Sequence, residues 1–101
     1  IHTSCVINAT GSNADNIRLL DDKESNEILS LSSGIHIVVK KEFLGSNEGI
    51  LLSNTSDKRI IFVLPYLNYC LIGTTDNKTI YTENIKVRDE EIEYLVSEVR
   101  R

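Results

Sequence analysis

The stretch Arg59–Asp76 constrains the fold of this chain more than any other part of the sequence. Two apolar runs, Ile60–Leu64 and Tyr69–Ile72, flank a short break at Pro65–Asn68. A run that is apolar at every position is typical of a strand covered on both faces. Proline cannot donate to a β-ladder, so Pro65 belongs at a strand end or in the turn. The stretch therefore predicts a hairpin in the middle of an antiparallel sheet.

Length and composition indicate one modest globular domain. The chain has 101 residues, of which 26% are charged and 41% hydrophobic, with a net charge of −4. The acidic balance and the lack of a basic patch argue against a nucleic-acid surface. No apolar run reaches the roughly 20 residues that cross a bilayer. Because the sequence opens on Ile-His-Thr-Ser, without Met or a signal pattern, we expect it to be cut from a longer protein.

Apolar periodicity predicts the other elements. We expect a strand at 4–10, a capped helix at 14–20, and further strands at 28–39 and 49–52. The last segment opens with acidic residues and carries one apolar stripe, which predicts a helix at 89–100 that packs on the sheet. That stripe consists of Ile92, Leu95, Val96 and Val99. The fold class is thus an antiparallel sheet of about four strands, including the central hairpin 59–76, with a C-terminal amphipathic helix.

A histidine beside a glycine is the most distinctive chemical feature of the predicted sheet. Alternation puts Ile35, Ile37 and Val39 on one face, and Gly34, His36 and Val38 on the other. We interpret the first face as core. On the second face, the absent side chain of Gly34 would leave a gap beside His36 for a ligand. The alternative, which spacing alone favours, is a structural histidine whose ring is hydrogen-bonded in a half-buried sheet.

Small residues end the first predicted strand, and they allow a second interpretation. At Ala9-Thr10-Gly11 nothing larger than threonine projects, so a backbone or a nucleotide cofactor can approach closely. The plainer alternative is a strand-to-turn junction. The sequence shows no Gly-rich phosphate loop, no paired Cys/His set for a metal and no Ser/His/Asp arrangement. Cys5 and Cys70 are expected to be reduced, buried thiols.

Four blocks of the sequence, in order, resemble the FAD-dependent glycerol-3-phosphate dehydrogenases. They are Val6–Gly11 with Ala14–Arg18, Ser32–Val39, Thr55–Pro65 running into Gly73–Asp76, and Glu90–Leu95. The combination of Gly-x-His-Ile-Val with Leu-Pro and Gly-Thr-Thr-Asp, at this separation, is the most specific part of the resemblance. The resemblance implies a central fragment of such an enzyme, with the end of the FAD-binding domain at 1–27 and much of the substrate domain at 28–101.

The resemblance also implies an activity and a set of site residues. Enzymes of this family oxidise sn-glycerol 3-phosphate to dihydroxyacetone phosphate and pass electrons to FAD and then to quinone. His36 matches the family histidine on the substrate side of the flavin, as base or substrate positioner. Gly34 and Thr74 match substrate-side positions, and Ala9, Thr10 and Gly11 match cofactor contacts. The Gly-x-Gly-x-x-Gly fingerprint and a downstream active-site arginine are missing here, so we expect the isolated fragment to be inactive and to bind no FAD.

Two other classes stay open at this point. One is a different flavoprotein oxidase of the same superfamily, of the amino-acid oxidase type. The other is a non-enzymatic binding module. By resemblance the parent protein would sit on the mitochondrial inner membrane, attached through parts outside this chain, or alternatively on a bacterial cytoplasmic membrane. An excised sheet exposes apolar edges, so the fragment itself is expected to self-associate.

Overall fold

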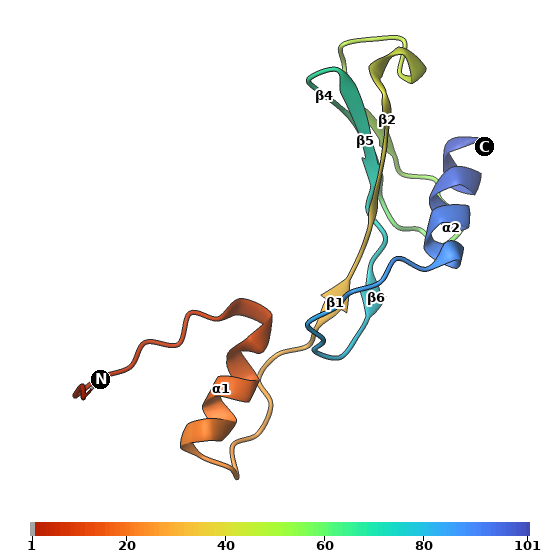
Figure 1. Ribbon diagram of the computed structural model, residues 1–101. Helices are drawn as coiled ribbons and strands as arrows, with labels where there is room; N and C mark the ends of the chain where they lie inside the picture. Colours follow the sequence, from red (N-terminus) through yellow and green to blue (C-terminus); the bar gives the residue numbers. More distant parts are fainter. Residues whose placement is uncertain (1) are drawn as a thin grey trace.

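The computed structural model describes residues 2–101 and shows a small sheet with one helix on it and a second helix apart from it (Figure 1). Two short 3₁₀ turns are also present: η1 (Gly11–Asn13) directly precedes the first helix, and η2 (Lys41–Phe43) lies between the second and third strands. The helices and strands are α1 (Ala14–Asp21), β1 (Ser32–Ser33), β2 (His36–Lys40), β3 (Ile50–Leu52), β4 (Ile61–Tyr66), β5 (Tyr69–Gly73), β6 (Asn77–Lys78) and α2 (Asp89–Val99). The predicted α+β class is confirmed.

The main sheet is built around the β4–β5 hairpin. Its order is β2-β5-β4-β3, and every neighbouring pair is antiparallel. Tyr66 pairs with Tyr69 across the two-residue turn Leu67-Asn68, and Leu67 takes the left-handed conformation that such a turn requires, with φ of 53°. Below the sheet, β1 and β6 form a separate two-stranded ribbon. The predicted central hairpin is therefore confirmed.

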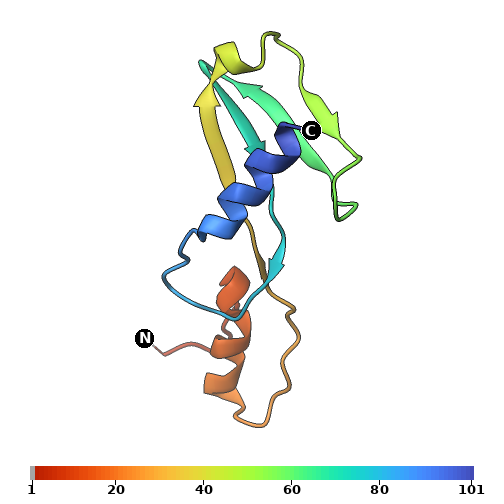
Figure 2. The ribbon, with the colours of Figure 1, turned by 90° about the vertical axis from the view of Figure 1, so that its right-hand side faces the viewer.

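Helix α2 covers one face of this sheet and closes the hydrophobic core (Figure 2). Leu95 of α2 is fully buried against the side chains that β4 and β5 direct toward the helix. Ile35, Ile37 and Val39 pack against the same cluster, as alternation along β2 predicts. The buried part of the core consists of Ile61, Val63, Cys70, Ile72 and Leu95.

The opposite face of the sheet is open. Phe62 and Leu64 are 45% and 44% exposed, and Val38 of β2 is 57% exposed. The prediction that Ile60–Leu64 is covered on both faces is thus wrong for residues 2–101, because α2 packs on one side only. A continuous apolar strand with one bare face indicates a surface that another layer of protein normally covers.

Several local predictions are also wrong. Residues 4–10 form no strand, because a strand needs a pairing partner and none of residues 2–101 provides one. The segment 28–31 is likewise not a strand; Asp15 of α1 instead accepts hydrogen bonds from the backbone N–H groups of Ile28 and Leu29. Cys5 is exposed rather than buried, whereas Cys70 is buried as predicted.

The molecule is elongated. Its radius of gyration is 18.6 Å, against about 13 Å for a compact domain of this length. Helix α1 contributes no buried residue, and it stands away from the sheet in Figures 1 and 2. The helix predicted at 14–20 is therefore confirmed as α1, but it does not belong to the hydrophobic core. In the part of the chain that the structure describes, neither helix is long and apolar enough to span a membrane.

Candidate functional site

His36 stands on the open face of the sheet, at the first position of β2. It pairs with Gly73 of β5, which pairs in turn with Phe62 of β4. The imidazole lies over Gly73, since a Cβ atom added there would come within 2.5 Å of the His36 Cδ2 atom. Within residues 2–101 the ring makes no hydrogen bond of the kind that marks a structural histidine. The ring is thus presented to whatever covers this face.

Gly34 packs directly against the end of β5. A Cβ atom at Gly34 would lie 1.9 Å from the Thr75 carbonyl oxygen and 2.6 Å from the Thr74 hydroxyl oxygen. The expected ligand-sized gap at Gly34 is therefore wrong, because the chain's own backbone fills that space. What glycine permits here is the close approach of two backbone segments. The structure does bring Gly34 and Thr74 together, next to the His36–Gly73 pair.

Two threonines join β2 to β5 where the ladder between them ends. The Thr74 hydroxyl lies 3.1 Å from the Ile35 carbonyl oxygen and 2.9 Å from the Thr75 carbonyl oxygen, either of which accepts its proton. The Ile35 N–H donates to the Thr75 hydroxyl oxygen at 2.9 Å. Both backbone polar groups of Ile35 are thus held by side chains. We call residues 34–36 and 73–75 together the His36 junction.

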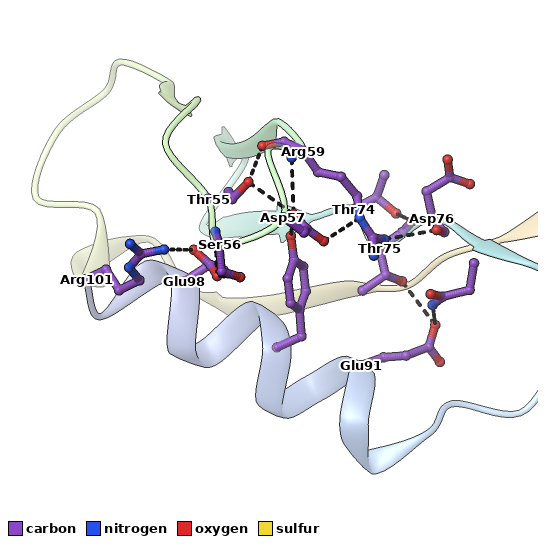
Figure 3. Close-up of polar contacts among 12 residues, drawn as sticks. Thr55, Ser56, Asp57, Arg59, Thr74, Thr75, Asp76, Glu91, Glu98 and Arg101 are labelled. Atoms are coloured by element: carbon purple, nitrogen blue, oxygen red, sulfur yellow. Dashed lines mark hydrogen bonds and ion pairs between the residues drawn. The ribbon is translucent and has the colours of Figure 1, made fainter.

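Glu91 of α2 supports this junction from the core side (Figure 3). Its buried carboxylate accepts hydrogen bonds from the Thr75 hydroxyl at 3.1 Å and from the Asn77 amide at 2.8 Å. Arg88 donates to it from both backbone and side chain. Burial raises the pKa of Glu91, but the hydrogen bonds from Arg88, Asn77 and Thr75 outweigh burial and hold the pKa below its usual value. Sequence reasoning missed Thr75 and Glu91, although both lie in blocks that carried the resemblance.

A second polar cluster attaches the other half of α2 to the turn before β4 (Figure 3). The Tyr94 hydroxyl donates to Asp57 at 2.8 Å, and the Arg59 guanidinium lies over the Tyr94 ring, 5.2 Å from its centre. Ser56 donates from its backbone and hydroxyl to Glu98. Burial raises the pKa of Asp57, but hydrogen bonds from Tyr94, Arg59 and Thr55 outweigh burial and hold the pKa below its usual value. The Arg59 guanidinium also donates to the Asp76 carbonyl oxygen at 2.9 Å, next to the His36 junction, but no side chain of this cluster bonds to His36 itself.

The predicted cofactor residues lie in the N-terminal segment, apart from the His36 junction (Figure 1). Ala9, Thr10 and Gly11 are exposed, and Gly11 has φ of +59° with open space where a Cβ would be. The Thr10 N–H and hydroxyl both donate to the side chain of Asn8. Nothing larger than threonine projects from this stretch, so another group can approach its backbone closely. Among residues 2–101, no three His, Cys, Asp or Glu side chains cluster as metal ligands.

The family model described as FAD dependent oxidoreductase matches residues 1–101. The chain belongs to this family.

The individual relatives all carry the name of one enzyme, which is narrower than the family description. The chain is 39% identical, over 99% of its length, to the mitochondrial glycerol-3-phosphate dehydrogenase of Homo sapiens. It is 41% identical over 94% of its length to a probable glycerol-3-phosphate dehydrogenase of Encephalitozoon cuniculi, and 35% identical over 99% to a probable mitochondrial one of Dictyostelium discoideum. The resemblance inferred from the four sequence blocks is confirmed.

A solved structure agrees with the sequence relatives. The glycerol-3-phosphate dehydrogenase from Bacillus halodurans, solved in complex with FAD, superposes with a TM-score of 0.71 and 28% identity over 85% of this chain. The chain spans only a small part of each of these proteins: 14% of the human relative, 16% of the Encephalitozoon one and 18% of the Bacillus chain. It aligns with one segment of each of these longer proteins.

Proposed function

We propose that residues 1–101 are a central segment of an FAD-dependent sn-glycerol-3-phosphate dehydrogenase. Residues 1–27 would end the FAD-binding domain and residues 28–101 would form much of the substrate-domain sheet. The observation that carries this proposal is the match of nearly the whole chain to relatives named glycerol-3-phosphate dehydrogenase. The full-length protein containing these residues, here called the complete enzyme, would oxidise glycerol 3-phosphate to dihydroxyacetone phosphate and pass electrons to quinone.

The His36 junction supplies groups suited to this reaction. Oxidation at C2 of glycerol 3-phosphate removes a hydride and the hydroxyl proton, and FAD, when bound, supplies the two-electron acceptor. His36 presents an imidazole on the open face, where it accepts the C2 hydroxyl proton or orients that hydroxyl. Thr74 contributes a hydroxyl oxygen that can accept a hydrogen bond from substrate while its own O–H donates to a backbone carbonyl. Gly34 lets Thr74 sit this close to β2.

Cofactor binding would need more of the protein than this segment. Ala9, Thr10 and Gly11 offer one exposed edge, and a dinucleotide also requires a phosphate-binding turn. The isolated 101-residue chain is therefore expected to purify without flavin and without dehydrogenase activity. A yellow preparation that retains flavin through gel filtration would contradict this part of the proposal.

The compartment follows from the relatives alone. Several of them are named as mitochondrial enzymes, which supports a mitochondrial location for the complete enzyme. Association with the inner membrane, through parts other than residues 1–101, belongs to the same proposal. A bacterial membrane-associated enzyme is the alternative, since the structural relative comes from Bacillus halodurans. Fractionation of the source cells distinguishes the two.

The substrate is tested by anaerobic mixing of the complete enzyme with candidate donors. We expect glycerol 3-phosphate to bleach the visible absorbance of the oxidised flavin, with one dihydroxyacetone phosphate formed per flavin reduced. Bleaching by amino acids, without bleaching by glycerol 3-phosphate, would support the amino-acid oxidase class and contradict the proposal. A complete protein that purifies without flavin and cannot be reconstituted would support a binding module.

A further inference from the structure

Thr75 lies at the centre of a buried hydrogen-bond chain that ends next to His36. It is only 3% exposed. Its hydroxyl oxygen accepts the Ile35 N–H at 2.9 Å, and its hydroxyl proton is donated to the Glu91 carboxylate at 3.1 Å. A threonine hydroxyl has one proton to give, so Glu91 determines the direction in which that proton points. The hydroxyl lone pairs are then free to hold Ile35.

Glu91 is held too firmly to follow Thr75. Three other donors meet its two oxygens: the Asn77 amide at 2.8 Å, the Arg88 N–H at 3.2 Å and the Arg88 Nε at 3.4 Å. A buried carboxylate costs much free energy unless its hydrogen bonds are made, so this arrangement resists displacement. The first turn of α2, which carries Glu91, therefore holds Thr75 in place just beyond the end of β5.

From these contacts we infer that Thr75 and Glu91 are positioning residues, which hold the Ile35 backbone so that His36 keeps its place on the open face and Thr74 keeps its place beside Ile35. Ile35 directly precedes His36, and its carbonyl oxygen lies 3.1 Å from the Thr74 hydroxyl. Displacement of Ile35 would therefore move both proposed substrate groups together. The inference rests on the proposed function, because it concerns the same site.

Glu98 provides a matched control on the same helix. Like Glu91 it is a buried carboxylate that accepts a hydroxyl hydrogen bond, here from Ser56, and that pairs with an arginine three residues away, here Arg101. Both carboxylates attach α2 to the sheet layer. Glu91 bonds to Thr75 of the His36 junction, whereas Glu98 bonds to Ser56 in the turn before β4 (Figure 3), so comparing the two carboxylates separates positioning of the junction from anchoring of the helix.

The test compares Thr75→Val, Thr75→Ser and Ser56→Ala in the complete enzyme. Valine keeps the shape of threonine but removes both hydrogen bonds, whereas serine keeps the hydroxyl. We expect Thr75→Val to lower kcat by about tenfold or more, with a smaller change in KM for glycerol 3-phosphate, since small misplacements at a site are costly. Thr75→Ser should restore kcat to within about twofold of wild type. Ser56→Ala should leave kcat unchanged while lowering the melting temperature.

The possible outcomes are distinct. Thr75→Val with wild-type kcat, or with a loss that serine does not restore, would overturn the inference while leaving the proposed function intact. A wild-type enzyme that does not oxidise glycerol 3-phosphate would overturn the proposed function and the inference together. If Thr75→Val does not yield folded holoenzyme, Glu91→Gln and Glu98→Gln decide: equal effects on kcat contradict the inference, and a loss confined to Glu91→Gln supports it.

Discussion

Gly34 and Gly73 show how two missing side chains set the geometry of the His36 junction. At Gly73 the imidazole of His36 lies where a side chain would stand. At Gly34 the same space is filled by the Thr75 carbonyl group. The two cases differ physically, because an imidazole can rotate away from an added methyl group, whereas a backbone carbonyl within a hydrogen-bonded junction cannot move without breaking contacts.

Replacement of Gly34 by alanine is therefore expected to destabilise the protein. The added methyl would stand 1.9 Å from the Thr75 carbonyl oxygen, so one backbone segment must shift. We expect a loss of about 2–3 kcal/mol in the free energy of unfolding, as for other overpacked sites. Gly45→Ala is the control, because its methyl meets nothing within 4 Å and costs only about 1 kcal/mol for a φ of +66°. Urea unfolding of both variants measures the two losses in the free energy of unfolding, and the loss should be larger for Gly34→Ala. Equal losses would contradict this prediction.

At the scale of elements, helix α2 is attached to the sheet by one buried leucine, Leu95, with a buried carboxylate one turn away on each side of it. Leu95 fills the core between them, while Glu91 and Glu98 bind threonine and serine hydroxyls of two different loops. The hydrogen bond from Ser56 is the main reason that the pKa of Glu98 lies below its usual value; burial opposes it, and Arg101 adds to the lowering. The helix is thus docked most firmly when both carboxylates are charged.

Acidification is expected to loosen α2. Both glutamates have folded-state pKa values below those of the unfolded chain, so their contribution to stability is fully present above the unfolded value and is lost as pH falls through the folded one. Stability of the complete enzyme should fall below about pH 4. The measurement is the urea midpoint as a function of pH. A Glu91→Gln, Glu98→Gln double variant that loses stability as steeply as wild type would contradict this account.

At the scale of the whole molecule, the exposed sheet face is the largest departure from an ordinary globular domain. β4 alone exposes Phe62, Leu64 and Tyr66 there, and β5 adds Tyr69. Together with the radius of gyration of 18.6 Å, this face indicates a layer of a larger protein. It is the same face on which His36 stands.

The isolated chain is accordingly expected to self-associate through this face. Size-exclusion chromatography with light scattering should give a mass above that of the 11.4 kDa monomer, and the dye ANS should bind strongly. Phe62→Lys combined with Leu64→Lys should reduce both signals. Ile92→Lys, on α2, is the control, since Ile92 is also partly exposed but lies on the helix. A monomer without ANS binding, or an equal effect of the control, would contradict the prediction.

The features that could be predicted from the sequence are those set by residues close together along the chain. The apolar alternation around His36 and the hairpin at Pro65–Asn68 depend on neighbours within a few residues, and both are confirmed. The helix at 89–100 is confirmed too, but its predicted packing stripe is only partly right: Leu95 is buried, whereas Ile92 and Val99 are 40% and 42% exposed and Glu91 and Glu98 are buried instead. The predicted strand at 4–10 is absent from the structure. Its apolar pattern was local, but strand formation depends on a pairing partner that lies elsewhere. Thr75 and Glu91 were missed for the same reason: their hydrogen bond joins residues 16 positions apart.

The most direct test of the central claim is the rate of anaerobic flavin reduction by glycerol 3-phosphate in the complete enzyme with His36→Gln. Glutamine keeps a polar side chain but cannot take up the substrate proton. We predict that the variant retains its FAD and that its flavin is reduced at least about a hundredfold more slowly than in wild type. Reduction at the wild-type rate would contradict the claim that the open sheet face of this chain carries the substrate site.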